Sequence, residues 1–214
     1  MKKILLIGDS IRMGYDKYVK SALENVAEVY YPSENARFAE YVLRYVQGWK
    51  SDLELGEDID LVHWNTGLWD VLELYGDEPL TTADYYENVV LRIYKRLRML
   101  FPKAKIIFAT TTAVAEEKMS PNFIRRNSVI EQYNNLAVKA LSKTDAIIND
   151  MYSITKNCAS ECRSDGVHFA TPMGISLTGN KVVSVICNEL GISASDVNIE
   201  NFEPEGYSAK NIGM

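Results

Sequence analysis

The stretch Ile4-Leu5-Leu6-Ile7-Gly8-Asp9-Ser10 decides the fold of this chain. Four consecutive apolar residues fit a short strand that is buried on both faces, and the Gly-Asp-Ser turn ends that strand at a tight bend. A helical pattern begins at once, because Tyr15, Val19 and Leu23 recur at four-residue spacing. The chain therefore opens with a strand, a turn and a helix, which is the first half of a β-α-β unit.

The same alternation continues along the chain. Four further apolar runs are expected to form strands, at residues 29–31, 61–64, 105–109 and 146–148, and segments with helical periodicity separate them. The runs are continuously apolar rather than alternating, as expected for strands that helices cover on both faces. The pattern predicts an α/β fold, a three-layer α/β/α sandwich with a five-stranded parallel sheet.

Three local signals predict where two of the helices begin or end. Thr81 and Asp84 resemble a capping box at the start of a helix. Thr171 is expected to cap the last helix, and Gly191 to end it. The segment between the fifth strand and that helix, residues 151–170, is expected to be a long loop.

Size and charge restrict the class of protein. The chain has 214 residues, of which 47% are hydrophobic and 24% charged, so we expect one domain over residues 1–192 and a C-terminal arm or tail over 193–214. A net charge of −6 argues against nucleic acid or an anionic membrane as a partner. We expect a small-molecule substrate instead, and the tail leaves a homo-oligomer open.

Apolar runs and cysteines restrict location and cofactors. No apolar run approaches the ~18 residues that span a bilayer, and the N-terminal run is too short for an export signal, so we expect a cytoplasmic protein that is not integral to a membrane. The three cysteines, Cys158, Cys162 and Cys187, form no even disulfide set. With only two histidines in the chain, a zinc site lacks ligands, and we expect no metal.

The chemistry is expected where the strands end, because ligands of open α/β sheets bind at the carboxyl edge. Ser10 lies on the turn after the first strand, and either a nucleophile or a simple helix cap fits that place. A serine nucleophile needs a base. His63 falls inside a predicted core strand, whereas His168 lies in a loop at the same edge as Ser10, and Asp165 precedes it by three residues. His168 is therefore the candidate base, with Asp165 to orient it.

Two motifs then define a resemblance. Gly8-Asp9-Ser10 and Asp165-Gly166-Val167-His168, in this order at the two ends of an α/β chain, resemble the first and last motif blocks of the SGNH/GDSL hydrolase superfamily. The resemblance covers residues 1–191 and implies a flavodoxin-like sandwich. It also implies Ser10 as nucleophile, His168 as general base and then acid, Asp165 as the orienting carboxylate, and ester hydrolysis through an acyl-enzyme without a metal or cofactor.

The two middle blocks depart from the family pattern. In the family, the nucleophile's amide, a glycine amide of the second block and an asparagine of the third block form the oxyanion hole. The first donor is then the amide of Ser10. The second block here has no glycine, so Ala36 or Arg37 takes that place. In the third block, Asn65 is the favoured donor, although an alignment on Gly and Asp puts Trp69 in the asparagine place.

The substrate pocket is less defined. Asp9, Arg12 and Trp69 are the candidate substrate-binding residues. Arg12 and Arg37 suit an anionic or strongly polar substrate, with a structural ion pair as the alternative. Trp64 and Trp69 lie near strand ends, where an aromatic face fits a sugar ring or an acyl chain, but such residues are more often part of the core.

The leading functional hypothesis is a serine esterase that hydrolyses small, acetyl-type esters, with carbohydrate esters as the expected substrates. Alternatives are a lysophospholipase or acyl-thioesterase that uses the same triad, and a catalytically weak binding protein with the same fold. A flavodoxin-like flavin or nucleotide binder is disfavoured, because no glycine-rich phosphate loop follows the first strand.

Overall fold

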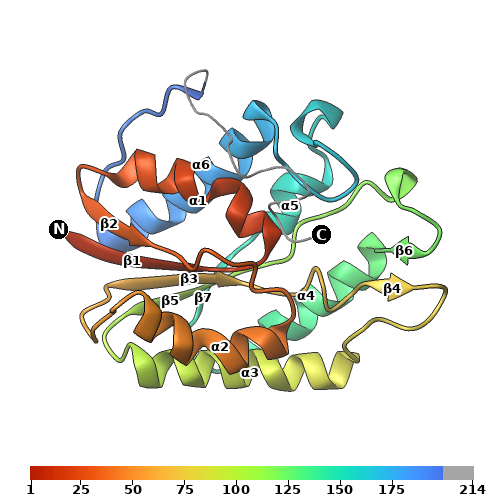
Figure 1. Cartoon of the computed structure of the whole chain (residues 1–214), viewed down its shortest axis with the longest axis horizontal. Helices are drawn as coiled ribbons and strands as arrows, with labels where there is room; N and C mark the ends of the chain where they lie inside the picture. Colours follow the sequence, from red (N-terminus) through yellow and green to blue (C-terminus); the bar gives the residue numbers. More distant parts are fainter. Residues whose placement is uncertain (200–214) are drawn as a thin grey trace.

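A five-stranded parallel sheet forms the middle layer of the structure, a computed structural model that describes residues 1–199 (Figure 1). The strand order is β2-β1-β3-β5-β7, and every neighbouring pair is parallel. The sheet strands are β1 (Lys2–Ile7), β2 (Ala27–Tyr30), β3 (Leu61–Asn65), β5 (Lys105–Ala109) and β7 (Ile147–Asn149). The predicted α/β sandwich with five parallel strands is confirmed.

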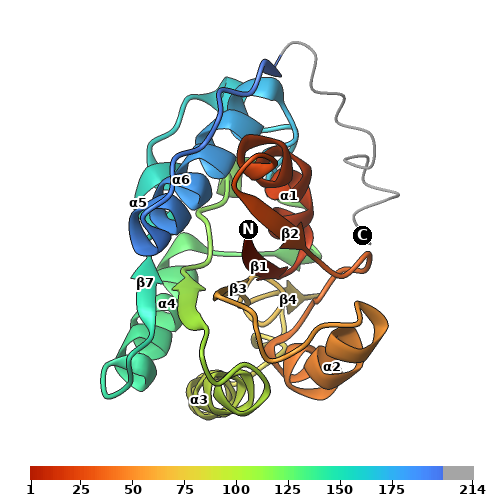
Figure 2. The ribbon, with the colours of Figure 1, turned by 90° about the vertical axis from the view of Figure 1, so that its left-hand side faces the viewer.

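Helices cover both faces of the sheet. Figure 2, which looks along the layers, shows α1, α5 and α6 on one face and α2, α3 and α4 on the other. The helices are α1 (Ser10–Leu23), α2 (Ala39–Asp52), α3 (Ala83–Leu100), α4 (Asn127–Leu141), α5 (Met151–Lys156) and α6 (Pro172–Leu190). The residues of β3 and the last four of β1 are buried between these layers, because the continuous apolar runs face helices on both sides.

The loops at the carboxyl edge contain structure that the sequence patterns did not indicate. A two-stranded antiparallel ribbon joins β4 (Glu73–Leu74) to β6 (Phe123–Ile124). The short helix α5 occupies the start of the predicted 151–170 loop, where the Asp150 side chain caps it by accepting from the Ser153 amide at 3.0 Å. That part of the loop prediction is wrong, because a local cap stabilises a helix of six residues.

The predicted helix ends are partly correct. The capping box at Thr81 and Asp84 is wrong: α3 begins after Thr82, and the Thr81 hydroxyl instead donates to the buried carboxylate of Asp70 at 2.8 Å. At the last helix, the Thr171 hydroxyl accepts from the Gly174 amide at 3.0 Å, and Gly191 ends the helix with φ +63°. Both α6 signals are confirmed.

The chain after α6 returns along the first helix. The Ser195 amide donates to the Ala22 carbonyl at 2.8 Å, and Val197 and Ile199 pack against the core. The rest of the predicted C-terminal arm, residues 200–214, lies outside the described residues. Among the helices that are described, none combines the length and apolar character needed to cross a bilayer.

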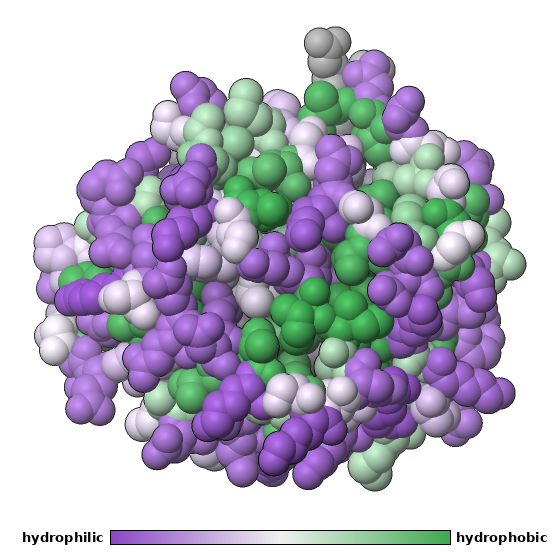
Figure 3. Space-filling view, turned by 180° about the vertical axis from the view of Figure 1, so that it is seen from behind, coloured by the Kyte–Doolittle hydropathy of each residue, from purple (hydrophilic) through white to green (hydrophobic). Residues whose placement is uncertain are grey.

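The molecule has a hydrophobic patch on the side opposite to that of Figure 1. Figure 3 shows this patch in the middle of that face, bordered by hydrophilic side chains. The edge strand β7 lies on this side (Figure 2), and its Ile147 and Ile148 are only partly buried.

Candidate active site

Ser10 is the first residue of α1 and follows the turn after β1, and the junction of these two elements lies at the carboxyl edge of the sheet (Figure 1). The turn is tight at Gly8, where a Cβ atom would lie 1.9 Å from Asn65 Oδ1 and 2.7 Å from Arg12 Cβ. Asp9 caps the helix, because its Oδ1 accepts from the Ile11 amide at 3.0 Å. Ser10 is the first residue of α1, so its own amide has no carbonyl partner one turn earlier and is free at the N-terminal end of the helix.

His168 and Asp165 reach the same edge from the loop before α6. His168 Nε2 lies 2.9 Å from Ser10 Oγ, and His168 Nδ1 lies 2.8 Å from Asp165 Oδ2. The other oxygen of Asp165 accepts from the amides of Val167 and His168 at 2.6 and 2.7 Å. The structure thus brings the three sequence-identified residues into one hydrogen-bonded line.

The hydrogen bonds of Asp165 define the proton positions in this line. Burial raises the pKa of Asp165, but the hydrogen bonds from the side chain and backbone of His168 outweigh burial, and the net pKa is well below its ordinary value. An ionised carboxylate only accepts, so Nδ1 of His168 carries a proton and donates it. In the neutral ring, Nε2 then accepts from the Ser10 hydroxyl, which is the arrangement of a nucleophile with its general base.

The candidate oxyanion donors lie near Ser10, but most of them already have partners. The Ala36 amide donates to the Gly8 carbonyl at 3.1 Å, and the Arg37 amide donates to Asn35 Oδ1 at 2.9 Å. Asn65 Nδ2 donates to Asp9 Oδ1 at 2.9 Å. Of the four sequence candidates, only the Ser10 amide is left without a protein acceptor among the described residues.

Two candidate substrate-binding residues, Arg12 and Asp9, are buried and form their hydrogen bonds with other groups of the protein. Arg12 is 1% exposed; it pairs with the buried Asp16 at 2.5 Å and donates to the Glu34 carbonyl at 2.6 Å. This is the structural ion pair that the sequence left as the alternative. Asp9 is also 1% exposed, and its carboxylate is held by the α1 cap and by Asn65. Burial raises the pKa of Asp9.

Of the two candidate tryptophans, one lies in the core and the other is partly exposed. Trp64 is completely buried and packs against Phe108, so it belongs to the core. Trp69 is partly exposed and meets Phe38 edge-on, with ring centroids 5.5 Å apart. His63 is also a core residue: Asn149 Nδ2 lies 3.1 Å from its Nε2, and burial lowers its pKa to about 3.

Arg125 is a residue of the carboxyl edge, near the candidate triad, that sequence reasoning missed. It follows β6 and is 4% exposed, and its Nε donates to the Leu68 carbonyl at 2.6 Å. Burial lowers the pKa of Arg125 to about 10, although the negative charges of Asp9 and Asp165 raise it in part. The guanidinium is therefore charged at neutral pH. A lone arginine between the two-residue strand β6 and α4 carries no periodic or motif signal.

A small hollow adjoins the nucleophile. It has a volume of about 10 Å³, which is room for roughly one water molecule. Its walls are Ser10, Ile11, Gly14, His168, Phe169, Ala170 and Thr178.

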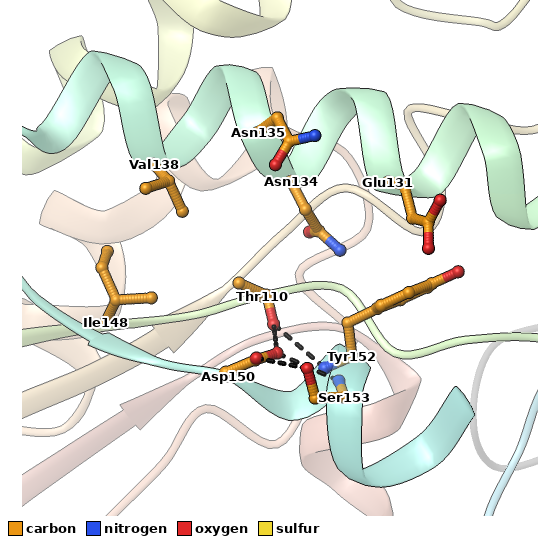
Figure 4. A pocket seen from close by; sticks show the side chains of 9 residues that line it. All are labelled: Thr110, Glu131, Asn134, Asn135, Val138, Ile148, Asp150, Tyr152 and Ser153. Atoms are coloured by element: carbon orange, nitrogen blue, oxygen red, sulfur yellow. Dashed lines mark hydrogen bonds between the residues drawn. The ribbon is translucent and has the colours of Figure 1, made fainter. Parts of the chain in front are cut away.

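A larger cavity of about 340 Å³ lies between α4 and α5, where none of the three catalytic candidates lines it (Figure 4). Its lining residues are Thr110, Glu131, Asn134, Asn135, Val138, Ile148, Asp150, Tyr152 and Ser153. Several of these polar groups already bond within the protein: Asp150 accepts from Thr110 and Ser153, and the Asn134 amide bonds both backbone groups of Thr111.

Comparisons with known proteins place the fold. No family model and no curated protein matches the sequence, but solved structures do. A lipase/acylhydrolase from Enterococcus faecalis has a TM-score of 0.67 at 19% identity, with 92% of this chain and 100% of that chain covered. An acetyl xylan esterase gives 0.64 at 19%, covering 86% and 99%. A GDSL-like lipase from Bacteroides thetaiotaomicron gives 0.64 at 16%, covering 87% and 88%. The chain therefore has the fold of GDSL-like lipases, acylhydrolases and acetyl xylan esterases, as its resemblance to the SGNH/GDSL superfamily predicted.

Proposed function

We propose that this protein is a serine esterase that hydrolyses small, acetyl-type esters through an acyl-enzyme on Ser10. The observation that carries the proposal is the line from Ser10 Oγ to His168 Nε2 at 2.9 Å and from His168 Nδ1 to Asp165 Oδ2 at 2.8 Å. A serine at a helix start is a weak nucleophile by itself, and this line gives it a base that is oriented by a carboxylate.

The geometry supports a two-step reaction. His168 Nε2 takes the proton from Ser10 Oγ as that oxygen attacks the acyl carbon, and then gives the proton to the leaving alcohol. The acyl-Ser10 ester is cleaved by water, with His168 again as base, and the Ser10 proton is restored at the end. Asp165 stays ionised and stabilises the imidazolium, since hydrogen bonds keep its pKa low. The Ser10 amide at the positive end of α1 faces the developing oxyanion.

The hollow beside Ser10 supports a short acyl group. With about 10 Å³ between Ile11, Phe169 and Thr178, it has room only for a group of roughly the size of a water molecule, and a long acyl chain does not fit inside it. This favours an acetyl ester over the lysophospholipid or long-chain thioester of the alternative hypotheses. One of the structural neighbours is described as an acetyl xylan esterase. This supports a carbohydrate as the alcohol portion of the ester.

Labelling with a fluorophosphonate probe tests the nucleophile. We expect the wild type and Ser153→Ala to be labelled, and Ser10→Ala to be neither labelled nor able to hydrolyse p-nitrophenyl acetate. Ser153 is a matched control, because it also lies in the first turn of a helix at the same edge. An unlabelled, inactive wild type would favour a binding protein with this fold, and labelling of Ser10→Ala would move the nucleophile elsewhere.

The substrate class has a separate test. Rates on p-nitrophenyl acetate, butyrate and octanoate should fall with chain length, and acetylated xylo-oligosaccharides should release acetate. Faster turnover of octanoate would contradict the acetyl preference and support the lipase reading.

A further inference from the structure

Arg125 is largely buried at the carboxyl edge of the sheet, but its guanidinium has donors that the protein does not use. Its Nε donates to the carbonyl of Leu68, which lies in the loop after β3 between Asn65 and Trp69. The side chain also covers the Phe123 ring, with 5.5 Å from Cζ to the ring centroid. Within residues 1–199, the two Nη groups meet no hydrogen-bond acceptor from the protein. Arg125 as a whole is only 4% exposed, but its Nη atoms keep contact with solvent, so they can donate to an anion at the surface of the site.

The charge of Arg125 acts next to the nucleophile. Asp9 and Asp165 both act on Arg125 electrostatically, and Arg125 in turn lowers the pKa of Asp9. Asp9 directly precedes Ser10 in the chain, and Asp165 holds the far side of the imidazole that contacts Ser10. The guanidinium therefore lies within electrostatic reach of both flanks of the reacting hydroxyl, although it forms no close ion pair with either carboxylate among the described residues.

Most of the other candidate oxyanion donors already have an acceptor within the protein. The Ala36 and Arg37 amides and the Asn65 side chain have acceptors within the protein at 3.1, 2.9 and 2.9 Å. The Ser10 amide and the second hydrogen of Asn65 Nδ2, whose first hydrogen is bonded to Asp9, are left for the negative oxygen of a tetrahedral intermediate. In known enzymes the loss of one donor of an oxyanion hole lowers kcat about 10²–10³-fold, so a further donor would strengthen this site.

We propose that Arg125 stabilises the oxyanion, with its Nη groups donating to the negative oxygen of the intermediate opposite the Ser10 amide. This inference rests on the proposed esterase function and names a residue of that same site. A guanidinium is suited to the role, because its hydrogen bonds to an anionic oxygen are charge-assisted and its planar fork is rigid. The third-block loop contributes by holding Arg125 in place through the Leu68 carbonyl.

Neutral substitutions of two adjacent arginines test the proposal. Arg125→Gln should lower kcat for p-nitrophenyl acetate about 100-fold, with KM changed less than about threefold, and Arg125→Lys should recover part of the loss. Arg126→Gln is the matched control: it removes the same charge one residue away, where the side chain is 44% exposed and pairs with Glu73 at 3.3 Å. Its kcat should equal that of the wild type.

A reversible boronic acid gives a readout that a merely structural role would not move. Its adduct with Ser10 is tetrahedral and anionic, so Arg125→Gln should weaken its inhibition by about the same factor as kcat/KM. Thermal melts of Arg125→Gln and Arg125→Lys check that both variants fold. If Arg125→Gln does not fold, the boronate affinity of Arg125→Lys decides, and it should be weakened in proportion to its kcat/KM.

Two results would overturn the role of Arg125 and leave the esterase proposal intact. One is an active wild type with an equally active Arg125→Gln. The other is a variant that changes only KM, and only for esters with a carboxylate group, which would assign Arg125 to recognition of a substrate anion. An inactive, unlabelled wild type would instead contradict the proposed function itself.

Discussion

Asp165 binds His168 at two places: its Oδ2 accepts from the ring Nδ1 at 2.8 Å, and its Oδ1 accepts from the backbone amide of the same residue at 2.7 Å. The double contact fixes the ring relative to its own backbone, three residues after the carboxylate. His168 therefore keeps Nε2 toward Ser10 in the absence of substrate, so the base is preorganised and needs little rearrangement in the reaction.

Substitution of Asp165 by Asn should remove the orientation of the ring with little change of shape. An amide side chain can donate to Nδ1, which favours the wrong tautomer and leaves Nε2 protonated. We expect kcat to fall about 10³–10⁴-fold, measured on p-nitrophenyl acetate. The melting temperature should change little, because an amide oxygen at the position of Oδ1 still accepts from the two backbone amides. A variant with more than a tenth of wild-type kcat would contradict the triad.

Asn65 is expected to act mainly on stability. Its Nδ2 is bonded to the buried Asp9 carboxylate at 2.9 Å, so Asn65→Ala would leave Asp9 with one donor fewer inside the protein. We expect a loss of about 1–3 kcal/mol in the free energy of unfolding, measured by urea titration. The opposite pattern, unchanged stability with a 100-fold loss of kcat, would show that Asn65 donates to the oxyanion as the family pattern has it.

Gly8 should tolerate no side chain. A Cβ there would lie 2.7 Å from Arg12 Cβ and 1.9 Å from Asn65 Oδ1, and Arg12 Cβ is fixed by its helix. Gly8→Ala is expected to cost about 1–3 kcal/mol and to lower activity by displacing Ser10. Gly48→Ala is the matched control inside α2, where no atom lies within 4 Å of the new Cβ. It should stabilise the protein by about 0.5–1 kcal/mol, so thermal melts of the two variants should shift in opposite directions.

The sheet was predictable because each of its strands carries its own local signal. The continuous apolar runs at β1, β3 and β5 need no tertiary information to be read as buried parallel strands. β4 and β6 have two residues each, too few for any period to appear. The role of Thr81 was also unpredictable, because the partner of its hydroxyl is Asp70, a buried carboxylate from another loop.

The candidate site also contains residues that sequence motifs predict and residues that they do not. Ser10, Asp165 and His168 lie in motifs with fixed spacing, and their meeting follows once both motifs are placed at the carboxyl edge. The availability of the oxyanion donors depends on which acceptors the folded loops bring to Ala36, Arg37 and Asn65, which spacing does not encode. Arg125 belongs to no motif, and it reaches the Leu68 carbonyl directly after β6, the second strand of the β4–β6 ribbon.

His63 should make the fold sensitive to acid. Burial lowers its pKa from 6.5 to about 3, so between these pH values the unfolded chain binds a proton that the folded protein does not. Stability is therefore complete above pH 6.5 and is lost as the pH falls, by about 1.4 kcal/mol per pH unit. Burial also raises the pKa of Asp70 to about 6, which acts in the opposite direction over part of this range, so the effect of His63 must be isolated by a variant.

His63→Gln removes the titrating group and keeps a polar side chain opposite Asn149. Urea titrations of the wild type and the variant at pH 6.5 and 4.5 should show that the wild type loses about 2–3 kcal/mol more than the variant over this interval, whatever their difference at pH 6.5. Asp70 is present in both proteins and cancels in the comparison. Asp165 titrates below this interval, because its pKa is lowered. Equal losses for the two proteins would mean that water reaches the His63 ring in the folded protein. The middle of β3 would then not be shielded from solvent.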